Sequence, residues 1–313
     1  MMKRVVKGLM VFSVGALPIF TSCIKERCAG CGAAPQYDSA GLMVSFSYNY
    51  DYVSGFTKST GSMDEGIRAS VFAFSSGDNP ERYPSFPGTP VVAVSDNFGN
   101  LTLRKGEYLF VPEGFYDFYS ISENRAGELG IKIASGVSSP LVNGTDYLWA
   151  SFKNSYIAVN TNICFIFRHC SAQIKIDFTE GDGVSDLHLL RVALAPAAKG
   201  GRMILSSGII SSADRVEDVF QEMLLSGSSA QFTMLPLKSG TEIPVEVDLR
   251  AKFDGVNPEF RKCKVLIPSP AGGFRGGSSY NFKAVVYAGG LELGEAVVLD
   301  WNIESTVNIN MTD

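Results

Sequence analysis

The chain has 313 residues, of which 45% are hydrophobic, 11% are aromatic and only 19% are charged. Its 27 basic and 32 acidic side chains give a net charge of −5, which excludes the strongly basic surface typical of nucleic-acid binding. The low charge and the many aromatic residues exclude a mostly disordered chain. Two histidines leave little room for a His-rich metal site. We therefore expect a globular protein of about two domains.

The amino terminus has the pattern of an export and anchoring signal. A basic start over residues 3–7 precedes an apolar run over 8–20, which is too short to span a bilayer. This run ends in Ile-Phe-Thr-Ser-Cys, and the sequence up to Cys23 resembles a bacterial lipobox. We predict a signal peptide over 1–22, lipid (palmitate) attachment at Cys23 and a tether over 23–41.

The other five cysteines show no catalytic or metal-binding pattern. Cys28 and Cys31 lie in a Gly/Ala/Pro-rich linker, without the strand and helix of a thioredoxin-like site and without a second pair for zinc. On one straight strand, Cys164 and Cys170 would lie about 20 Å apart, too far for a disulfide. For Cys170 and Cys263, a disulfide and two buried thiols are both compatible with the sequence.

Short alternating segments separated by turn residues fill the rest of the chain. Residues 42–50 alternate apolar and polar side chains with a period of two, as in a half-buried strand. Further strand patterns cover 68–74, 101–103, 108–111, 115–121, 146–150, 156–159, 163–178, 187–194, 231–235, 243–253, 262–267, 279–287, 296–301 and 306–311. We predict an all-β fold of two consecutive antiparallel β-sandwich domains, over 42–160 and 161–313.

Two details of the second domain are also predicted. The run 163–178 reads as one long strand whose apolar face changes near Arg168-His169, which indicates a bulge. Apolar residues between Val216 and Leu224 recur at spacings of three and four, and Ser211 precedes Asp214 in a capping-box spacing. This second pattern predicts one short helix.

The sequence contains no recognisable catalytic constellation. It has no Gly-x-Ser-x-Gly elbow, no phosphate-binding loop and no His-Glu-x-x-His motif. We expect His169 to be a half-buried structural histidine. Trp149 and Trp301 are expected in the core or at a domain interface. We therefore expect no enzyme, no metal and no cofactor.

Six sequence features follow one another along the chain: the lipobox at Cys23, GFYDFYS at 114–120, DYLWA at 146–150, FRHCSAQI at 167–174, SYNF at 279–282 and VLDWN at 298–302. In this order, they resemble the fimbrillin family of Bacteroidales surface lipoproteins. The resemblance covers nearly the whole chain and leaves the stalk, anchor and tip roles open. It implies Greek-key-like, transthyretin-like sandwich domains and an outer-membrane lipoprotein on the cell surface, within a fimbrium (pilus) that serves adhesion.

The resemblance also implies assembly with other fimbrial subunits by strand exchange. In the scheme that the resemblance implies, an Arg-specific protease cuts after the first strand and the exposed groove accepts a strand from a neighbour, whereas anchor-type members keep their first strand and Arg68 would then be an ordinary surface arginine. The apolar face of the strand that would be lost is Leu42, Val44, Phe46, Tyr48 and Tyr50. The candidate cleavage site is Arg68-Ala69. The candidate donor strand carries Val307, Ile309 and Met311.

A second function, from a different class, is also compatible with the sequence. Two sandwich domains with exposed aromatic residues would serve a monomeric glycan-binding surface lipoprotein, because aromatic rings stack on sugar faces. Polymer ladders after protease treatment would favour the fimbrial subunit, and glycan binding by a strict monomer would favour the alternative. Neither function involves nucleic acid, and the surface receptor is left open.

Overall fold

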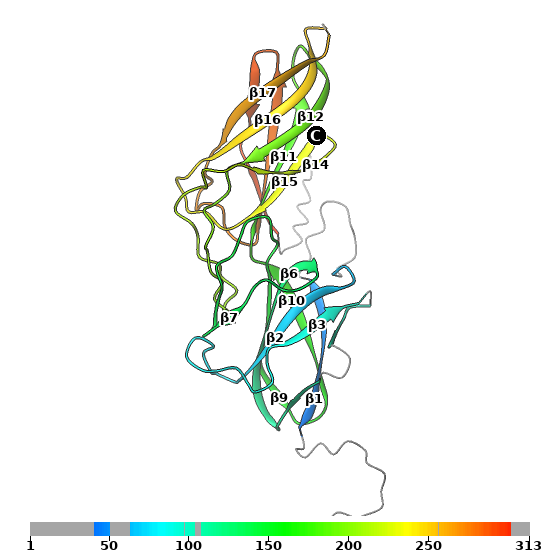
Figure 1. Cartoon of the computed structure of the whole chain (residues 1–313), viewed down its shortest axis with the longest axis vertical. Helices are drawn as coiled ribbons and strands as arrows, with labels where there is room; N and C mark the ends of the chain where they lie inside the picture. The colour runs from blue at the N-terminus through cyan, green and yellow to red at the C-terminus, as the bar shows by residue number, and fades with distance from the viewer. Residues whose placement is uncertain (1–40, 51–62, 97, 104–107, 256, 302–313) are drawn as a thin grey trace, which may run out of the picture. The chain divides into compact units, whose positions relative to one another are not determined.

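The computed structural model describes residues 41–50, 63–96, 98–103, 108–255 and 257–301 (Figure 1). Every regular element in these residues is a β-strand, from β1 to β20, and this confirms the all-β class. In the same residues, no helix is long and apolar enough to cross a membrane. The predicted signal peptide and tether lie outside the described residues.

The first sheet has eight strands and closes on itself. Its strands are β1 (Leu42–Tyr50), β2 (Ile67–Ser75), β3 (Val91–Ser95), β4 (Asn100–Leu103), β5 (Leu109–Val111), β6 (Gly114–Ala126), β9 (Leu148–Ile157) and β10 (Thr161–His169). They pair in the order β10-β9-β6-β2-β3-β4-β1-β5, and β1 also pairs with β10. Seven strands therefore form a closed, barrel-like ring, and β5 lies outside it against β1. A separate hairpin joins β7 (Ile133–Ala134) to β8 (Val137–Ser138).

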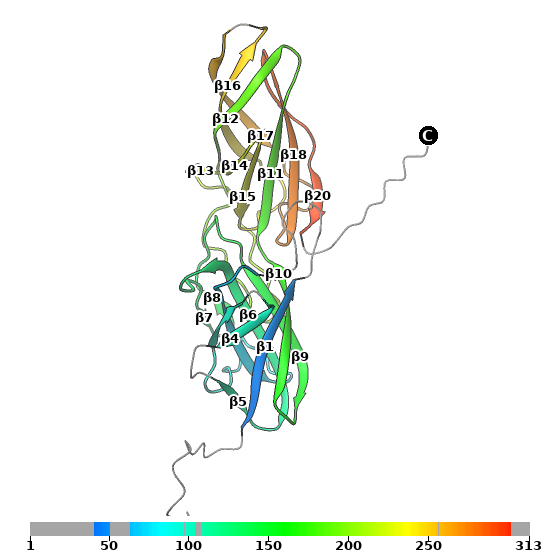
Figure 2. The ribbon, with the colours of Figure 1, turned by 90° about the vertical axis from the view of Figure 1, so that its right-hand side faces the viewer.

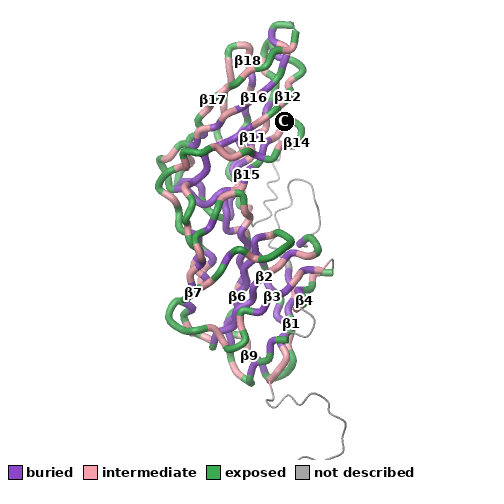
Figure 3. Tube along the Cα trace, in the orientation of Figure 1, coloured by how far each residue is buried: buried purple, intermediate pink, exposed green. Residues whose placement is uncertain are grey.

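Two further sheets follow along the chain. One contains β11 (Ala172–Glu180), β14 (Leu224–Ser226), β15 (Ser229–Met234), β18 (Ser278–Tyr287), β19 (Gly290–Leu293) and β20 (Val297–Asp300). The other contains β12 (Val184–Leu194), β13 (Gln221–Glu222), β16 (Ile243–Phe253) and β17 (Glu259–Ile267). Inward side chains of both sheets belong to one core, for example Ile174 on β11 and Val247 on β16. Figure 3 shows buried residues in purple along the strands of both sheets. Alternation with a period of two produces this burial in β11 and β16.

The sheets are mixed, so the prediction of purely antiparallel sheets is wrong. β1 pairs with β10 in parallel, and β11 pairs with β18 in parallel, whereas the other strand pairs are antiparallel. Parallel and antiparallel strands share the same alternation of side chains. Whether two strands pair in parallel or antiparallel depends on which distant strand becomes the neighbour. The local sequence pattern does not carry that information.

The run 163–178 forms two strands in two sheets, so the predicted bulge is wrong. β10 ends at His169 in the closed sheet, and β11 begins at Ala172 in the six-stranded sheet. The apolar face changes because the chain passes from one core to another at Cys170-Ser171. β10, which lies after the predicted boundary at 160, therefore shares a sheet with the strands before that boundary.

The predicted helix between 211 and 224 is also wrong. Val216 forms a β-bridge with Ala197, and the Met223 amide donates to the carbonyl of Val192 at 2.8 Å. Long-range backbone hydrogen bonds thus replace those of a helix. The apolar spacing was misleading because the residues share no buried face: Val219 is 67% exposed and Leu224 is 74% exposed.

Trp149 lies in the core and His169 in a largely buried position, as the sequence predicted. Trp149 is buried, and its indole Nε1 donates to the carbonyl of Leu205 at 2.7 Å. His169 is largely buried, and its Nδ1 lies 2.8 Å from a carboxylate oxygen of Asp146. The Trp301 ring lies flat on the imidazole at a centroid distance of 4.0 Å. These contacts give His169 a structural role.

Thiol labelling of the native protein should distinguish its cysteines. Cys164, Cys170 and Cys263 carry free thiols, so the structure contains the thiols rather than the disulfide at Cys170 and Cys263. Cys164 is exposed, whereas burial raises the pKa of the Cys170 thiol to about 12. Because the thiolate is the reactive form, a maleimide should modify Cys164 and spare Cys170 until the protein is unfolded. Peptide mass mapping reads both sites, and equal native labelling would contradict the burial of Cys170.

Candidate strand-exchange site

The first strand, β1, closes the ring of the first sheet. One of its edges pairs in parallel with β10, from Val44↔Thr161 to Tyr50↔Phe167. Its other edge pairs with β5 at Leu42↔Val111 and with β4 at Phe46↔Leu101 (Figure 2). Both edges of β1 are therefore satisfied by backbone hydrogen bonds. Removal of this strand would open the ring and leave β10 on one side and β4 and β5 on the other.

The inward face of β1 inserts side chains into the core of the ring. Val44, Phe46 and Tyr48 are all buried. The Phe46 ring stacks on Phe165 at a centroid distance of 5.7 Å and meets Phe118 edge-on at 6.3 Å. These contacts make Phe46 the central anchor of the strand. Of the other residues predicted on this face, Leu42 is partly exposed, and the side chain of Tyr50 lies outside the described residues.

Tyr48 anchors the far end of the strand by hydrogen bonding. Its hydroxyl lies 3.1 Å from the carbonyl oxygen of Met63 and 2.9 Å from that of Asp96, and it donates to these acceptors. The backbone amide of Tyr48 donates to the carbonyl of Gly99 at 2.9 Å. Burial, together with the Asp96 carboxylate, raises the pKa of Tyr48 above its ordinary value of 10.0. The neutral phenol is therefore the form that the fold favours.

This shift predicts an alkaline loss of stability. Because the pKa of Tyr48 is raised in the folded state, its stabilising contribution is fully present below about pH 10 and is lost as the pH rises through the folded value. We expect the free energy of unfolding to fall less steeply above pH 10 in Tyr48→Phe than in the wild type. Urea unfolding between pH 8 and 11 measures this slope. Tyr83→Phe, at an exposed position, is the control and should keep the wild-type slope.

The outward face of β1 is held by two asparagines from the turn and strand that follow β9. The amide of Met43 donates to Oδ1 of Asn160 at 2.9 Å. The Asn162 side chain accepts from Ser45 Oγ at 3.1 Å and donates to Ser47 Oγ at 2.8 Å. Sequence reasoning missed these partners, because polar residues at alternate positions of a strand only indicate an exposed face.

The candidate cleavage site, Arg68-Ala69, lies at the start of β2. Ala69 is fully buried, and the carbonyl of Arg68 accepts from Ser122 Oγ at 2.7 Å. The pairing of β2 with β6 shifts register between Ile67 and Ala69, so Arg68 sits at an irregularity of the ladder. A protease needs an extended, accessible backbone, and here the first residues of β2 must separate from β3 and β6 before the bond is reached.

The remaining predicted site residues are not placed. Lipidation at Cys23 and the donor residues Val307, Ile309 and Met311 lie outside the described residues, as do Cys28 and Cys31. The structure therefore brings together the first strand, its two neighbouring edges and the region of the candidate cleavage site.

A model of a known protein family matches most of this chain. A family model described as fimbrillin-like matches residues 57–301. The chain belongs to the fimbrillin-like family. No curated protein matches this fimbrillin-like sequence. The match begins after β1, so the strand that closes the ring lies outside the part shared with the family model.

Solved structures share the fold of this fimbrillin-like chain. A Bacteroides uniformis protein to which a cell-adhesion role is ascribed gives a TM-score of 0.60 at 14% identity, over 85% of this chain and 100% of the other. A protein of Bacteroides ovatus with the same ascribed role gives 0.58 at 12% identity, over 84% and 98% of the two chains. One of Bacteroides fragilis gives 0.53 at 13% identity, over 83% and 97%. At such low identity, the likeness concerns the fold.

Proposed function

We propose that this chain is a lipid-anchored fimbrial subunit of a bacterial outer membrane, which assembles by β-strand exchange and serves adhesion. The observation that carries the proposal is the position of β1, an amino-terminal strand that closes the ring of a fimbrillin-like fold. The family is one of structural fimbrial proteins, so we propose no enzymatic reaction. The solved relatives to which cell adhesion is ascribed support the same role.

Strand exchange follows from what loss of β1 would expose. The groove would be lined by core residues such as Phe165 and Phe118, between two unpaired strand edges. An open edge binds an incoming strand by main-chain hydrogen bonds, and alternate apolar side chains fill its pockets. Val307, Ile309 and Met311 have the required spacing of two, so a second copy could supply them.

Proteolysis at Arg68-Ala69 is proposed to release β1. The bond lies inside β2, so cleavage would act on a locally opened chain or before the ring closes. An Arg-specific protease should yield a subunit that begins at Ala69, and Arg68→Lys should block this product. Amino-terminal sequencing of surface fibres provides the measurement. Fibres whose subunits begin at Cys23 would refute the cleavage.

Assembly itself is tested by polymer formation. Protease-treated wild-type protein should give a ladder of oligomers that resists mild detergent, because a donated strand completes each subunit. The Arg68→Lys protein should remain monomeric under the same treatment. An equal ladder from both proteins would contradict release of β1 as the trigger.

The two-domain organisation is part of the proposal. We assign the closed sheet to an amino-terminal domain and the two later sheets to a carboxy-terminal sandwich domain of transthyretin-like type. The strands of the closed sheet pair only with one another among the described strands, which supports this assignment. A signal peptide over 1–22 and a tether over 23–41 would precede the first domain.

Lipid anchoring is tested separately. Radiolabelled palmitate should enter the wild-type protein and should be absent from Cys23→Ala, which should leave the membrane fraction. A Cys23→Ala protein that is still labelled would refute the assignment. The alternative function, a monomeric glycan-binding lipoprotein, predicts binding on a glycan array by a chain that forms no oligomers.

A further inference from the structure

One end of the closed sheet carries exposed apolar side chains, which we call the aromatic rim. The rim consists of Tyr108, Phe110, Phe115, Tyr156 and Val159, with exposed fractions of 56%, 39%, 54%, 51% and 67%. Its members come from the β5–β6 region and from the β9–β10 hairpin. Soluble monomers rarely gather large exposed apolar groups, and such a patch marks an interaction surface.

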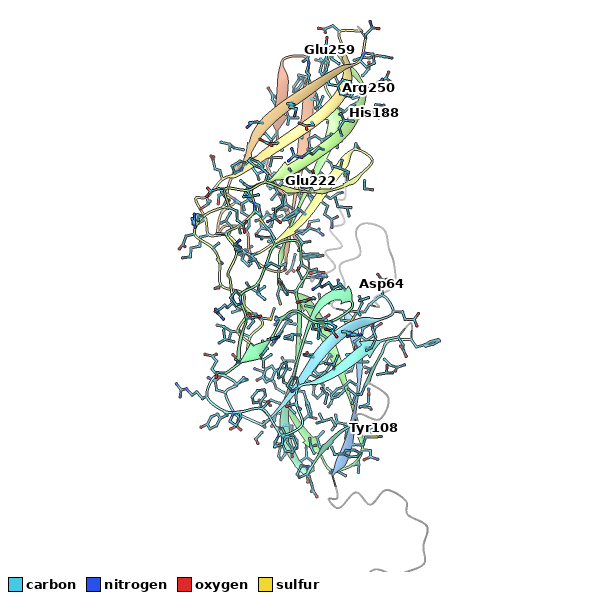
Figure 4. All side chains as sticks on the ribbon, viewed as in Figure 1. Asp64, Tyr108, His188, Glu222, Arg250 and Glu259 are labelled. Atoms are coloured by element: carbon cyan, nitrogen blue, oxygen red, sulfur yellow. The ribbon has the colours of Figure 1, made fainter. Side chains whose placement is uncertain are left out.

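Strand pairing brings these side chains together around the start of β1. Phe115 and Tyr156 are cross-strand partners, and their ring centroids lie 4.7 Å apart. The rings of Tyr108 and Phe110 lie 6.1 Å apart, and Phe110 pairs with Met43 on β1. Figure 4 places Tyr108 beside the blue strand β1.

Val159 joins the rim through the β9–β10 turn. Its carbonyl accepts a hydrogen bond from the Thr161 hydroxyl at 2.7 Å. Thr161 pairs with Val44, close to the first residue of β1. The rim therefore surrounds the point at which the chain enters the sheet, at Gly41.

The described residues of the rim carry little charge. The segments 41–43, 108–115 and 156–161 contain a single charged side chain, Glu113, and Arg104, Lys105 and Glu107, which precede Tyr108 in the sequence, lie outside the described residues. Its carboxylate accepts a hydrogen bond from the Tyr156 hydroxyl. The outer face of β16 and β17, by comparison, carries the ion pairs Lys262–Asp248 and Lys264–Glu246. Aromatic and tyrosine-rich surfaces without charge suit the boundary between water and a bilayer.

The length of the chain between Cys23 and Gly41 indicates that the membrane is what contacts this surface. On the proposed function, the uncleaved chain carries its lipid at Cys23 and its tether ends at Gly41, and cleavage at Arg68-Ala69 later removes lipid, tether and β1 together. These 18 residues span at most about 60 Å when fully extended, so the lipid keeps the entry point of β1 within about 60 Å of the membrane. We propose that the aromatic rim inserts into the headgroup region of the outer membrane and holds this end of the closed sheet against the bilayer.

Because the lipid tethers the protein to the membrane, a weak contact between the rim and the bilayer is sufficient for docking. Attachment of the lipid converts docking of the rim into an intramolecular event, so the local concentration of membrane is high. Stable membrane attachment commonly uses two signals. The rim supplies the second signal and fixes the orientation of the uncleaved subunit on the surface.

The first experiment measures how deeply a rim residue inserts into the bilayer when the complete lipoprotein is bound to vesicles. The lipidated protein, uncleaved at Arg68-Ala69, is reconstituted in vesicles of phosphatidylethanolamine and phosphatidylglycerol, with or without brominated acyl chains. A Tyr156→Trp reporter should shift its emission to the blue, and brominated lipid should quench it at least twofold. Phe260→Trp, at a 74% exposed position on β17, is the matched control and should be unaffected. A reporter at position 156 that is not quenched in vesicle-bound protein would overturn the proposal.

A second assay tests the rim without the lipid. The Cys23→Ala chain, which lacks the lipid and leaves the membrane fraction of cells, should still partition weakly into the same vesicles at millimolar lipid. The triple variant Phe110→Ser, Phe115→Ser, Tyr156→Ser should lose at least tenfold in this partitioning, whereas Phe260→Ser should lose nothing. Circular dichroism verifies that the variants fold, and unchanged partitioning of a folded triple variant would overturn the inference. Failure of palmitate labelling would refute the anchor alone.

A second copy of the chain is the competing occupant of the rim. It predicts that the emission of the Tyr156→Trp reporter shifts to the blue as the protein concentration rises, in the absence of vesicles. That result would overturn the membrane assignment. A shift that requires vesicles and is independent of protein concentration would support it.

Discussion

Replacement of Phe46 by alanine is expected to lower the free energy of unfolding by about 3–5 kcal/mol, the range for Phe→Ala in protein cores. Phe46 is buried at the centre of β1, stacked on Phe165 and edge-on to Phe118. The closed ring surrounds the side chain, so neighbouring residues can only partly fill the resulting cavity. Urea unfolding, combined with amide exchange of β10, assigns the loss to the closed sheet.

The matched control is the adjacent position on the other face of β1. Ser45 is exposed, and its hydroxyl hydrogen bonds to Asn162. Ser45→Ala should change the free energy of unfolding by no more than about 0.5 kcal/mol. A cost below about 1 kcal/mol for Phe46→Ala would contradict the role of Phe46 as the anchor of the strand.

The same substitution bears on strand exchange. A weaker β1 should be replaced more easily by a competing strand, because the incoming strand has to displace fewer core contacts. A labelled peptide of residues 42–50 should therefore enter Phe46→Ala protein faster than wild-type protein. Equal rates in the two proteins would indicate that β1 does not limit opening of the ring.

Local alternation was enough to predict many of the strands, including β1 and its buried face. Val44, Phe46 and Tyr48 face the core as the spacing of two requires, and Ser45 and Ser47 face outward. The all-β class followed from many such segments with turns between them. These properties depend on neighbouring residues, which a single sequence displays directly.

Pairing could not be predicted, because it depends on residues far apart in the chain. No feature of 42–50 indicates that its neighbour is the parallel strand β10, more than a hundred residues later. The same limitation produced the wrong helix: spacings of three and four near Val216 were outweighed by backbone bonding to the strands before it.

In the candidate site, too, some properties follow from the local sequence and others depend on strand pairing. The sequence identified Arg68 as a basic residue that follows the first strand. Its position inside β2, next to the fully buried Ala69, came from the pairing of β2 with β3 and β6. The aromatic rim also depends on pairing, because Phe115 and Tyr156 are distant in sequence and become neighbours only across β6 and β9.

Substitution of Gly208 by alanine is the second change with a large expected effect. Gly208 has a φ of +72°, and a β-carbon there would lie 2.6 Å from Cγ and Cδ2 of Trp149. Trp149 is buried and fixed by its hydrogen bond to the carbonyl of Leu205. Backbone strain of about 1 kcal/mol and overpacking of about 1–3 kcal/mol should together destabilise the protein by about 2–4 kcal/mol.

Gly227 provides a control that separates strain from packing. Its φ is +60°, and a β-carbon there would meet nothing within 4 Å. Gly227→Ala should therefore cost only the strain, about 1 kcal/mol, and the remainder in Gly208→Ala measures displacement of Trp149. In a Trp301→Phe background, tryptophan emission should shift to the red in Gly208→Ala and stay unchanged in Gly227→Ala. Equal losses of stability in the two variants, with no spectral shift, would show that Trp149 tolerates a methyl group at position 208.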